Sequence, residues 1–209
     1  MYPFVKRALD FFCCAIALIL ASPLLIVVAI VMAIHFKGNP FFVQKRIGKN
    51  NVPFKIYKLK SMTNEKDSEG NLLPNEQRLT KTGVWLRRSS IDEIPQLFNV
   101  VLGSMSLIGP RPMGLNYLNL FTEEQKQRHQ VKPGITGWAQ INGRDEVAPT
   151  EKFKMDVWYV NNRSFALDFK ILLRTVLIVF KREGVDNRAS DVNFPDNGSY
   201  NTNVSGSKK

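Results

Sequence analysis

The chain has 209 residues and carries 29 lysine and arginine residues against 18 aspartate and glutamate residues, a formal net charge of +11. This length allows one well-buried core, and the charge points to anionic partners: lipid headgroups, phosphates or nucleic acid. The only cysteines, Cys13 and Cys14, are adjacent and exclude a disulfide framework. The two histidines, His35 and His129, lie in no zinc-ligand spacing, so a zinc site is not expected.

The first expected element is an apolar segment without charged residues at positions 11–34, which is about long enough to cross a bilayer as a helix. This segment is too long for a signal peptide, and no small-residue cleavage site follows it. Ser22 and Pro23 lie close to its middle. Because proline removes a backbone donor and crowds the preceding turn, we expect a kink there, with the Ser22 hydroxyl bonding a carbonyl that the break frees.

Two arrangements of this segment are open on physical grounds. It can be a plain transmembrane helix, or a re-entrant helical hairpin that dips into the membrane and returns on the same side. Cationic residues on both flanks favour two ends on one cytoplasmic face: Lys6 and Arg7 precede the segment, and Lys37, Lys45 and Arg46 follow it. Many spanning helices also contain a proline, so the pattern alone fits both arrangements.

A β-hairpin is expected next. Two short β-like runs, at residues 41–43 and 54–57, are separated by a turn sequence at 48–51. Residues 61–77 are polar and are predicted to form an exposed loop. Helical spacing of apolar residues follows within 78–102, at Ile91, Ile94, Leu97, Phe98 and Val101.

The second half of the chain continues the mainly helical pattern. Residues 122–130 are predicted to form a short solvated helix, and the turn-rich stretch 132–144 to form a shaped loop. Residues 165–181 are apolar on most sides with a few basic positions, which suits either a core helix or a helix lying flat at a membrane interface. The polar end of the chain predicts a disordered tail without chemistry. The expected fold class is therefore α+β and mainly helical.

The adjacent carboxylates Asp92 and Glu93 are the strongest candidates for chemistry. They follow Arg87 and precede Pro95, which is tolerated in a first helical turn, so they are expected at a helix start. One interpretation is structural, because Ser90 and Glu93 match a capping box. The other is functional: a helix start and nearby arginines keep a carboxylate ionised and attract a phosphate, which an ionised carboxylate can attack. A neighbouring carboxylate could hold Mg²⁺.

Four further residues are candidates, and each has a structural interpretation of its own. Arg111 lies between two prolines, so it is either a rigid phosphate ligand or a surface arginine in a rigid loop. Lys58 on a β-like run reads by itself as a solvated lysine, and Asp156 as half of an ordinary ion pair. Trp138 either stacks on a base or anchors its loop.

Together these pieces resemble a known family, the bacterial sugar transferases or monotopic phosphoglycosyl transferases. The resemblance extends from residue 2 to about residue 185. Besides the apolar segment with Ser22 and Pro23, the motifs that carry it are FKIYKLKSM (54–62), SSIDEIPQLFNV (89–100), SLIGPRP (106–112) and KPGITGWAQINGR (132–144). The likeness is greatest to short members, which transfer a phospho-sugar from a UDP-sugar to undecaprenyl phosphate.

The resemblance implies three parts of the chain. Residues 1–36 would form a re-entrant membrane helix hairpin broken at Ser22 and Pro23. Residues 37–185 would form a small cytoplasmic catalytic domain with a short β-hairpin and interfacial amphipathic helices, and residues 186–209 a disordered polar tail. The protein would lie in the bacterial inner membrane with this domain on the cytoplasmic face, in contact with membrane lipid.

The resemblance also implies roles for individual residues. Asp92 would be the nucleophile and Glu93 its Mg²⁺-associated partner, while the phosphate and nucleotide site would include Lys58, Arg87, Arg111 and Asp156. Asp92 would attack the β-phosphate of a UDP-sugar, release UMP and carry a covalent phospho-sugar. Undecaprenyl phosphate would then accept the sugar phosphate, which initiates the assembly of a surface polysaccharide or protein glycan.

Alternative functions follow from the same residues. Within enzymes, the transfer can be direct, with a carboxylate acting only as base or metal ligand. Outside enzymes, the charge of +11 suits a membrane-tethered binding protein for anionic partners, and a structural adaptor is a further possibility. A nucleic-acid-binding face predicts basic and aromatic residues without carboxylates among them. Asp92 and Glu93 beside arginines argue against nucleic acid as the partner.

Overall fold

The computed structural model describes residues 2–143 and 147–181 and confirms a mainly helical α+β fold. The predicted tail at 186–209 and the last residue of the predicted loop, Arg144, lie outside the described residues. Two small sheets contain the strands β1 (Phe41–Ile47), β2 (Pro53–Leu59), β3 (Ser106–Ile108) and β4 (Gly134–Thr136). The helices are α1 (Tyr2–His35), α2 (Asn75–Arg78), α3 (Lys81–Arg88), α4 (Gln96–Val101), α5 (Glu123–Lys126), α6 (Trp138–Asn142), α7 (Pro149–Asn162) and α8 (Phe165–Lys181). Short 3₁₀ turns are η1 (Lys49–Asn51), η2 (Ile91–Glu93), η3 (Leu115–Tyr117) and η4 (Gln127–Gln130).

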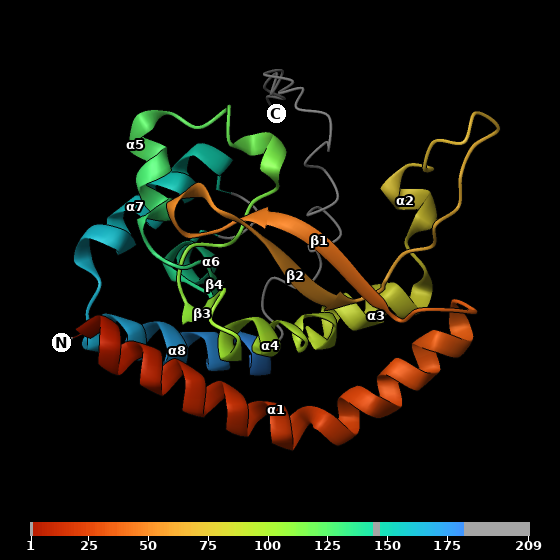
Figure 1. Cartoon of the computed structure of the whole chain (residues 1–209), viewed down its shortest axis with the longest axis horizontal. Helices are drawn as coiled ribbons and strands as arrows, with labels where there is room; N and C mark the ends of the chain where they lie inside the picture. Colours follow the sequence, from red (N-terminus) through yellow and green to blue (C-terminus); the bar gives the residue numbers. More distant parts are fainter. Residues whose placement is uncertain (1, 144–146, 182–209) are drawn as a thin grey trace, which may run out of the picture.

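Helix α1 is one bent helix of 34 residues that follows one side of the molecule (Figure 1). Pro23 lies inside it, and the Ser22 hydroxyl donates to the backbone carbonyl of Ile19 at 2.7 Å. Ile19 is four residues before Pro23, so this is the carbonyl that the missing proline N–H leaves without a helical donor. The predicted serine bond is confirmed, and Pro23 lies within a helix that is continuous and bent (Figure 1).

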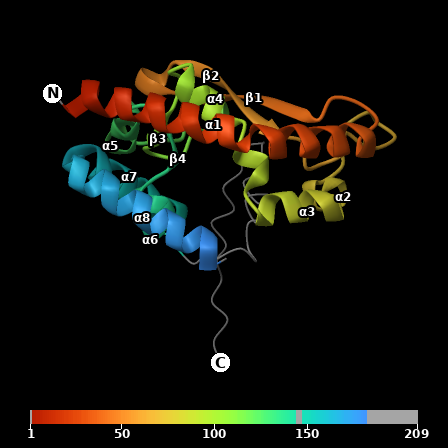
Figure 2. The same ribbon diagram turned by 90° about the horizontal axis from the view of Figure 1, so that it is seen from below.

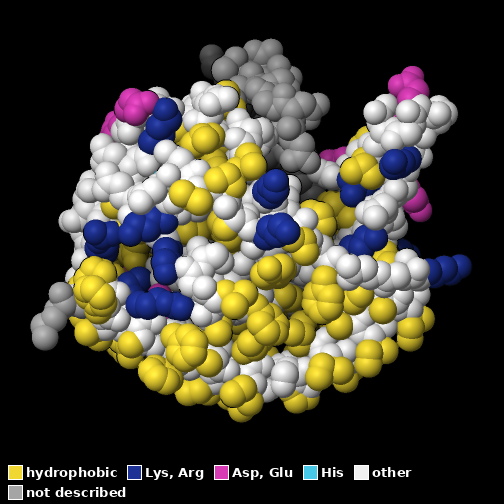
Figure 3. Space-filling view, viewed as in Figure 1, with side chains coloured by type: hydrophobic (Ala, Val, Ile, Leu, Met, Phe, Trp, Pro, Cys, Tyr) yellow, Lys and Arg dark blue, Asp and Glu magenta, His cyan; other side chains and the backbone are white. Residues whose placement is uncertain are grey.

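The apolar surface of α1 is mostly exposed. Among the described residues, α1 is the only helix long and apolar enough to cross a membrane, and 17% of its most apolar window is buried inside the protein. Figure 3 shows an almost continuous band of hydrophobic side chains along this side of the molecule. A surface of this extent requires an apolar environment, which indicates a membrane-bound protein.

Two of the sets of contacts that hold α1 against the rest of the chain lie on either side of Pro23. The first arm of α1 is the part before Pro23. There, the Arg7 guanidinium donates to the carbonyls of Val100 at 2.5 Å and Val101 at 2.9 Å, at the carboxyl end of α4. A cation is favourable there because the last carbonyls of a helix lack partners and carry partial negative charge. On its second arm, a hydrophobic cluster joins α1 to β2, α3 and η2; its members include Leu25, Val28, Met32, Leu59, Leu86, Ile91 and Ile94.

The predicted β-hairpin is confirmed. Strands β1 and β2 pair in antiparallel fashion from Phe41 opposite Leu59 to Ile47 opposite Pro53. Between them, Asn50 has a φ of 55°, which is the left-handed conformation that asparagine tolerates better than most residues. Lys58 is the second-to-last residue of β2, and the hairpin packs β2 against η2.

The prediction for residues 132–144 was wrong in part. This stretch contains strand β4, which pairs in parallel with β3, and helix α6. Its glycines permit close backbone approach: a Cβ atom on Gly134 would lie 2.1 Å from the backbone nitrogen of Gly109. A parallel pairing between distant segments leaves no local signal in the sequence. The turn residues alone therefore predicted a loop.

The predicted helical region 78–102 divides into α3, η2 and α4. Ser90 has a φ of 57°, in the left-handed region that non-glycine residues rarely adopt, and Pro95 follows η2 directly before α4. Four of the five predicted apolar positions pack into hydrophobic clusters, whereas Phe98 is 43% exposed. The interruption places Asp92 and Glu93 on a separate turn between two helices.

Helix α8 combines both predicted interpretations. Ile171 is completely buried in a cluster with β3, α6 and α7, so one face belongs to the core. The opposite face exposes large apolar side chains together with Lys170 and Arg174, as an interfacial helix would. Helices α1 and α8 lie on the same side of the molecule and diverge when seen from below (Figure 2). Among the side chains of α8 that the structure describes, the exposed large apolar ones are Phe165, Phe169, Leu173, Val176, Leu177 and Val179.

Candidate active site

The carboxylate pair lies on η2, a single 3₁₀ turn. The predicted capping box does not form, because Ser90 makes no side-chain cap bond and has a left-handed backbone instead of the extended one that an N-cap requires. The Glu93 backbone nitrogen instead donates to the carbonyl of Ser90 at 3.1 Å. The Ser90 side chain therefore does not cap the turn that carries the two carboxylates.

Glu93 is held by two cationic side chains. Its Oε1 accepts from Lys58 Nζ at 3.0 Å and from Arg111 Nη2 at 3.0 Å. Lys58 comes from β2, whereas Arg111 comes from the proline-rich segment after β3. Three of the predicted site residues thus meet at one carboxylate oxygen, although they are distant in sequence.

Asp92 is buried, with 6% of its surface exposed. Burial, followed by the negative charge of Glu93, raises the pKa of Asp92 to about 6, against the lowering influence of Lys58, Arg87 and Arg111. Desolvation therefore outweighs the nearby cations in setting the direction of this pKa shift. With this pKa the carboxylate is mostly ionised at pH 7 yet more basic than a solvated aspartate, which suits either nucleophilic attack or proton acceptance.

Arg87 approaches the carboxylate pair from the last turn of α3. Its Nε donates to the Ser61 hydroxyl at 3.0 Å, and its charge acts on Asp92. The backbone of α3 passes close to the same serine, because a Cβ atom on Gly83 would lie 1.8 Å from the Ser61 carbonyl oxygen. Gly83 thus allows the close approach that sets Arg87 beside the site.

Asp156 lies behind the site, with 3% of its surface exposed on α7. Its Oδ2 accepts from Arg128 Nη2 at 2.6 Å and from Arg128 Nε at 3.1 Å. Arg128 Nη2 also donates to the backbone carbonyl of Arg111 at 2.8 Å. Asp156 therefore reaches the site through Arg128, which links it to the segment that carries Arg111.

Sequence reasoning missed Arg128. Its position in the predicted solvated helix gave no signal of burial, yet its guanidinium lies over the rings of Phe121 at 5.4 Å and Phe153 at 5.1 Å. The adjacent His129 is also buried, and burial and then the Arg128 charge lower its pKa to about 4. His129 is therefore neutral and its Nδ1 bonds Asn51 Oδ1 at 2.7 Å, which ties the hairpin turn to η4. The predicted Thr122 start of this helical region is confirmed by a capping box with Gln125.

The remaining predicted residues lie outside this cluster. Trp138 packs against Trp158, with ring centroids 4.8 Å apart, and Lys170 lies over its ring. This contact matches the interpretation of Trp138 as an anchor. Ser22 and Pro23 belong to the bend of α1.

The side chains around Glu93 determine whether a metal ion could bind there. No group of three or more histidine, cysteine or acidic side chains that could hold an ion occurs within residues 2–143 and 147–181. Mg²⁺ commonly takes only one or two protein carboxylates and completes its shell with phosphate oxygens and water. Asp92 and Glu93 fit this pattern only if a substrate supplies phosphate oxygens.

Comparisons with known proteins show what the whole chain is similar to. The family model described as "Bacterial sugar transferase" matches residues 1–182. The chain is 50% identical over 181 residues to the uncharacterized sugar transferase EpsL of Bacillus subtilis (strain 168), covering 87% of this chain and 90% of that protein.

Two further relatives carry names that state an activity. The UDP-N-acetylgalactosamine-undecaprenyl-phosphate N-acetylgalactosaminephosphotransferase of Aeromonas hydrophila is 38% identical, with 84% of this chain matched to 44% of that protein. The undecaprenyl-phosphate glucose phosphotransferase of Komagataeibacter xylinus is 40% identical, with 82% of this chain matched to 35% of that protein. The chain thus spans less than half the length of these two relatives. With a family model that covers most of its length, the chain belongs to the family of bacterial sugar transferases.

Proposed function

We propose that this protein transfers a sugar 1-phosphate from a UDP-sugar to undecaprenyl phosphate and releases UMP. The observation that carries the proposal is the buried, basic Asp92 beside Glu93, whose carboxylate is held by Lys58 and Arg111. The relatives named as undecaprenyl-phosphate phosphotransferases support the substrate classes. This reaction would initiate the assembly of a surface polysaccharide or protein glycan.

The proposed reaction has two displacements at one phosphorus atom. A carboxylate oxygen of Asp92 attacks the β-phosphorus, and the bond to the bridging oxygen breaks, so UMP leaves and the sugar phosphate stays on Asp92. An oxygen of the lipid phosphate then attacks the same phosphorus and restores the Asp92 carboxylate. Splitting a transfer in this way is characteristic of covalent catalysis by carboxylates.

The cationic side chains support both displacements. Arg111 presents a planar set of donors that suits phosphate oxygens, and Arg128 fixes its backbone carbonyl at 2.8 Å. Lys58 and Arg111 hold Glu93 in position at 3.0 Å each. Glu93 would hold Mg²⁺ together with substrate phosphate oxygens, and the ion would neutralise charge on the diphosphate. Arg87 adds positive charge beside Asp92.

The membrane arrangement follows from α1. We propose that residues 1–36 form a re-entrant hairpin whose bend at Pro23 turns the chain back toward the cytoplasmic face of the inner membrane. Residues 37–185 would then form the catalytic domain at the membrane surface. The cationic flanks on both sides of the apolar segment and the exposed apolar face of α8 support this placement.

The raised pKa of Asp92 also favours a second mechanism, in which Asp92 acts as a base and the lipid phosphate attacks the UDP-sugar directly. The two mechanisms differ in the covalent intermediate. Protein incubated with a UDP-sugar labelled in the sugar, with Mg²⁺ and without lipid acceptor, should retain label and release one equivalent of UMP. The conservative variant Asp92→Asn should do neither.

A panel of UDP-sugars with undecaprenyl phosphate and Mg²⁺ provides the activity assay. UMP release that depends on both substrates supports the proposed function, and its complete absence across the panel would contradict it. Full UMP release by Asp92→Asn would exclude the covalent mechanism. If the wild-type protein is active but retains no label, direct transfer is favoured.

A further inference from the structure

Three cationic side chains from distant parts of the chain gather beside the first arm of α1. Arg7 comes from α1, Lys49 from η1, and Lys132 from the segment before β4. Arg7 Nη2 and Lys132 Nζ both lie within 4 Å of one point, the position that a Cβ atom on Gly103 would occupy. We refer to Arg7, Lys49 and Lys132 as the basic cluster.

The basic cluster has little opposing charge. Within the described residues, neither Lys49 nor Lys132 forms an ion pair, and the Arg7 guanidinium donates to backbone carbonyls, which carry only partial negative charge. Asp10 is the carboxylate whose charge acts on Lys132. It already accepts a hydrogen bond from Ser106 Oγ at 2.6 Å and lies 3.7 Å from Lys6 Nζ.

The mutual repulsion in the cluster shows in Lys132. Burial, followed by the charges of Arg7 and Lys49, lowers the pKa of Lys132 despite the opposing influence of Asp10. Holding these cations together therefore costs free energy in the isolated protein. An anion bound among them would offset this cost, because a negative charge stabilises the protonated, positively charged forms of the three side chains.

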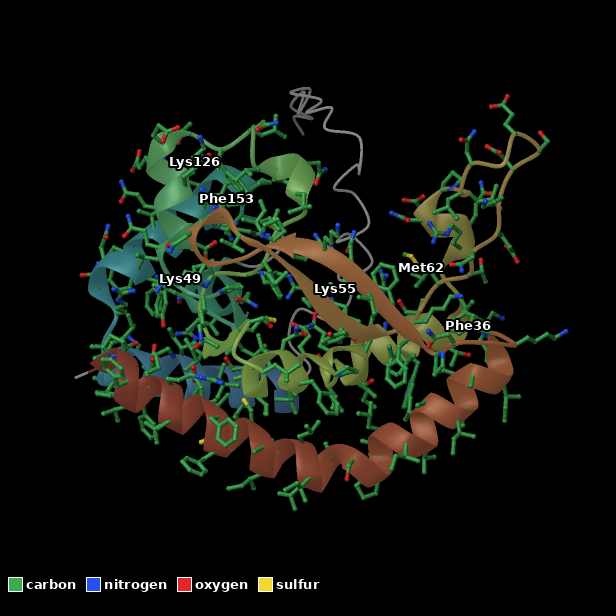
Figure 4. All side chains as sticks on the ribbon, in the orientation of Figure 1. Phe36, Lys49, Lys55, Met62, Lys126 and Phe153 are labelled. Carbon is green, nitrogen blue, oxygen red and sulfur yellow. The ribbon has the colours of Figure 1, made fainter. Side chains whose placement is uncertain are left out.

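The position of the cluster indicates where that anion lies. Arg7 precedes the charge-free stretch 11–34 by about one helical turn, so its guanidinium lies at the boundary of the apolar surface. Figure 3 shows lysine and arginine side chains gathered directly above the hydrophobic band near the start of the chain, and Figure 4 places Lys49 on this side. Headgroup phosphates occupy this level at the edge of the hydrocarbon core of a bilayer.

We propose that the basic cluster binds the phosphate of an anionic phospholipid headgroup, at a site separate from the carboxylate pair. The site lies at the carboxyl end of α4, whereas Asp92 precedes the amino end of this helix. The proposal rests on the membrane placement of α1 in the proposed function. A lipid bound here would fix the first arm of α1 against the carboxyl end of α4.

The test uses the full chain in a neutral detergent and three probes: short-chain phosphatidylglycerol, short-chain phosphatidylcholine and inorganic phosphate. The test variant is Lys49→Gln with Lys132→Gln. The matched control, Lys126→Gln with Lys154→Gln, removes the same charge from two lysines that form surface ion pairs on α5 and α7. Thermal unfolding is followed as each probe is added.

Phosphatidylglycerol at about a hundred times its Kd should raise the melting temperature of the wild type and the control by about 5 °C or more. The test variant should lose most of this shift, and phosphatidylcholine should produce none. An equal shift in the test variant would overturn the proposal, and so would an equal shift with inorganic phosphate, which would indicate a soluble ligand. The single variant Lys49→Gln, at an exposed position, gives the same reading if the double variant folds poorly. UMP release in neutral detergent reports separately on the proposed function.

Discussion

Arg128 and Asp156 form an ion pair in which both side chains are almost fully buried and two guanidinium nitrogens contact one carboxylate oxygen, at 2.6 and 3.1 Å. The same guanidinium reaches the backbone of Arg111 at 2.8 Å. The pair therefore supports the core and at the same time fixes the segment that presents Arg111 to Glu93.

Replacing Asp156 with alanine should destabilise the protein strongly. It would leave a buried arginine without its counter-charge, which costs about 3–5 kcal/mol. At this chain length we expect the melting temperature to fall by roughly 10 °C. Glu151→Ala on the same helix breaks the exposed pair with Lys154 and should cost at most about 1 kcal/mol. Similar losses of stability in the two variants would mean that the buried ion pair stabilises the protein no more than the exposed pair does.

Arg128→Lys should impair the proposed transfer through Arg111. Lysine keeps the charge but cannot hold Asp156 and the Arg111 carbonyl together with a planar set of donors. We expect kcat/KM to fall at least tenfold, and a double-mutant cycle with Arg111→Lys to show that the two losses are not additive. Fully additive losses would show that Arg128 acts independently of Arg111.

Asp92→Asn should become relatively more stable than the wild type as the pH rises. The folded-state pKa of about 6 lies above the ordinary value of 3.8, so the folded state binds more protons than the unfolded state between these values. Wild-type stability therefore falls as the pH rises through this window, by up to about 3 kcal/mol, and the asparagine variant avoids this loss.

The measurement is the difference in melting temperature between Asp92→Asn and the wild type at pH 4.5 and pH 7.5. The difference should be clearly larger at the higher pH. Asp67→Asn, in the exposed loop after β2, controls for the general effect of removing a carboxylate. A difference that shrinks toward pH 7.5 would mean that the nearby cations outweigh burial at Asp92.

Lys58→Met should lower transfer activity by about tenfold to a hundredfold and raise the Mg²⁺ concentration required. Lys58 orients the carboxylate proposed to hold the ion, and loss of such supporting groups typically has this effect. Lys55→Met provides the control, because Lys55 is an exposed lysine of the same strand (Figure 4). Equal activity in the two variants would contradict the role given to Lys58.

The bend of α1 gives a prediction about topology. In a background with Cys13 and Cys14 replaced by alanine, single cysteines at Phe4 and Lys37 should both react with an impermeant maleimide in inverted vesicles. Neither should react in vesicles of native orientation. Reaction of the two positions from opposite sides would identify α1 as a spanning helix and exclude the re-entrant hairpin.

Local patterns in the sequence predicted much of the fold. The turn at 48–51 between β-like runs, the Thr122 cap, and the helix at 165–181 all depend on interactions within a few residues, and each is confirmed. The carboxylate pair could be proposed as a site because its resemblance extended over several motifs. The meeting of Lys58 and Arg111 at Glu93 had no local signal.

The features that escaped prediction depend on distant contacts. Burial of Arg128 needs Asp156 from another helix and two aromatic rings, none of which its own helical segment reveals. The parallel pairing of β3 with β4 likewise joins separate segments. The raised pKa of Asp92 likewise depends on how deeply η2 is buried, which the sequence around it does not reveal.

Helix α1 also sets an order for biogenesis. It is synthesised before its packing partners, and Leu86 follows Met32 by several seconds at about 5–20 residues per second. During that interval its apolar surface lacks the protein groups on which it later packs, so in the proposed membrane placement the lipid bilayer would cover it first. The remainder of the chain would then fold onto a helix already in the membrane, and the carboxylate turn between α3 and α4 would be assembled against that helix.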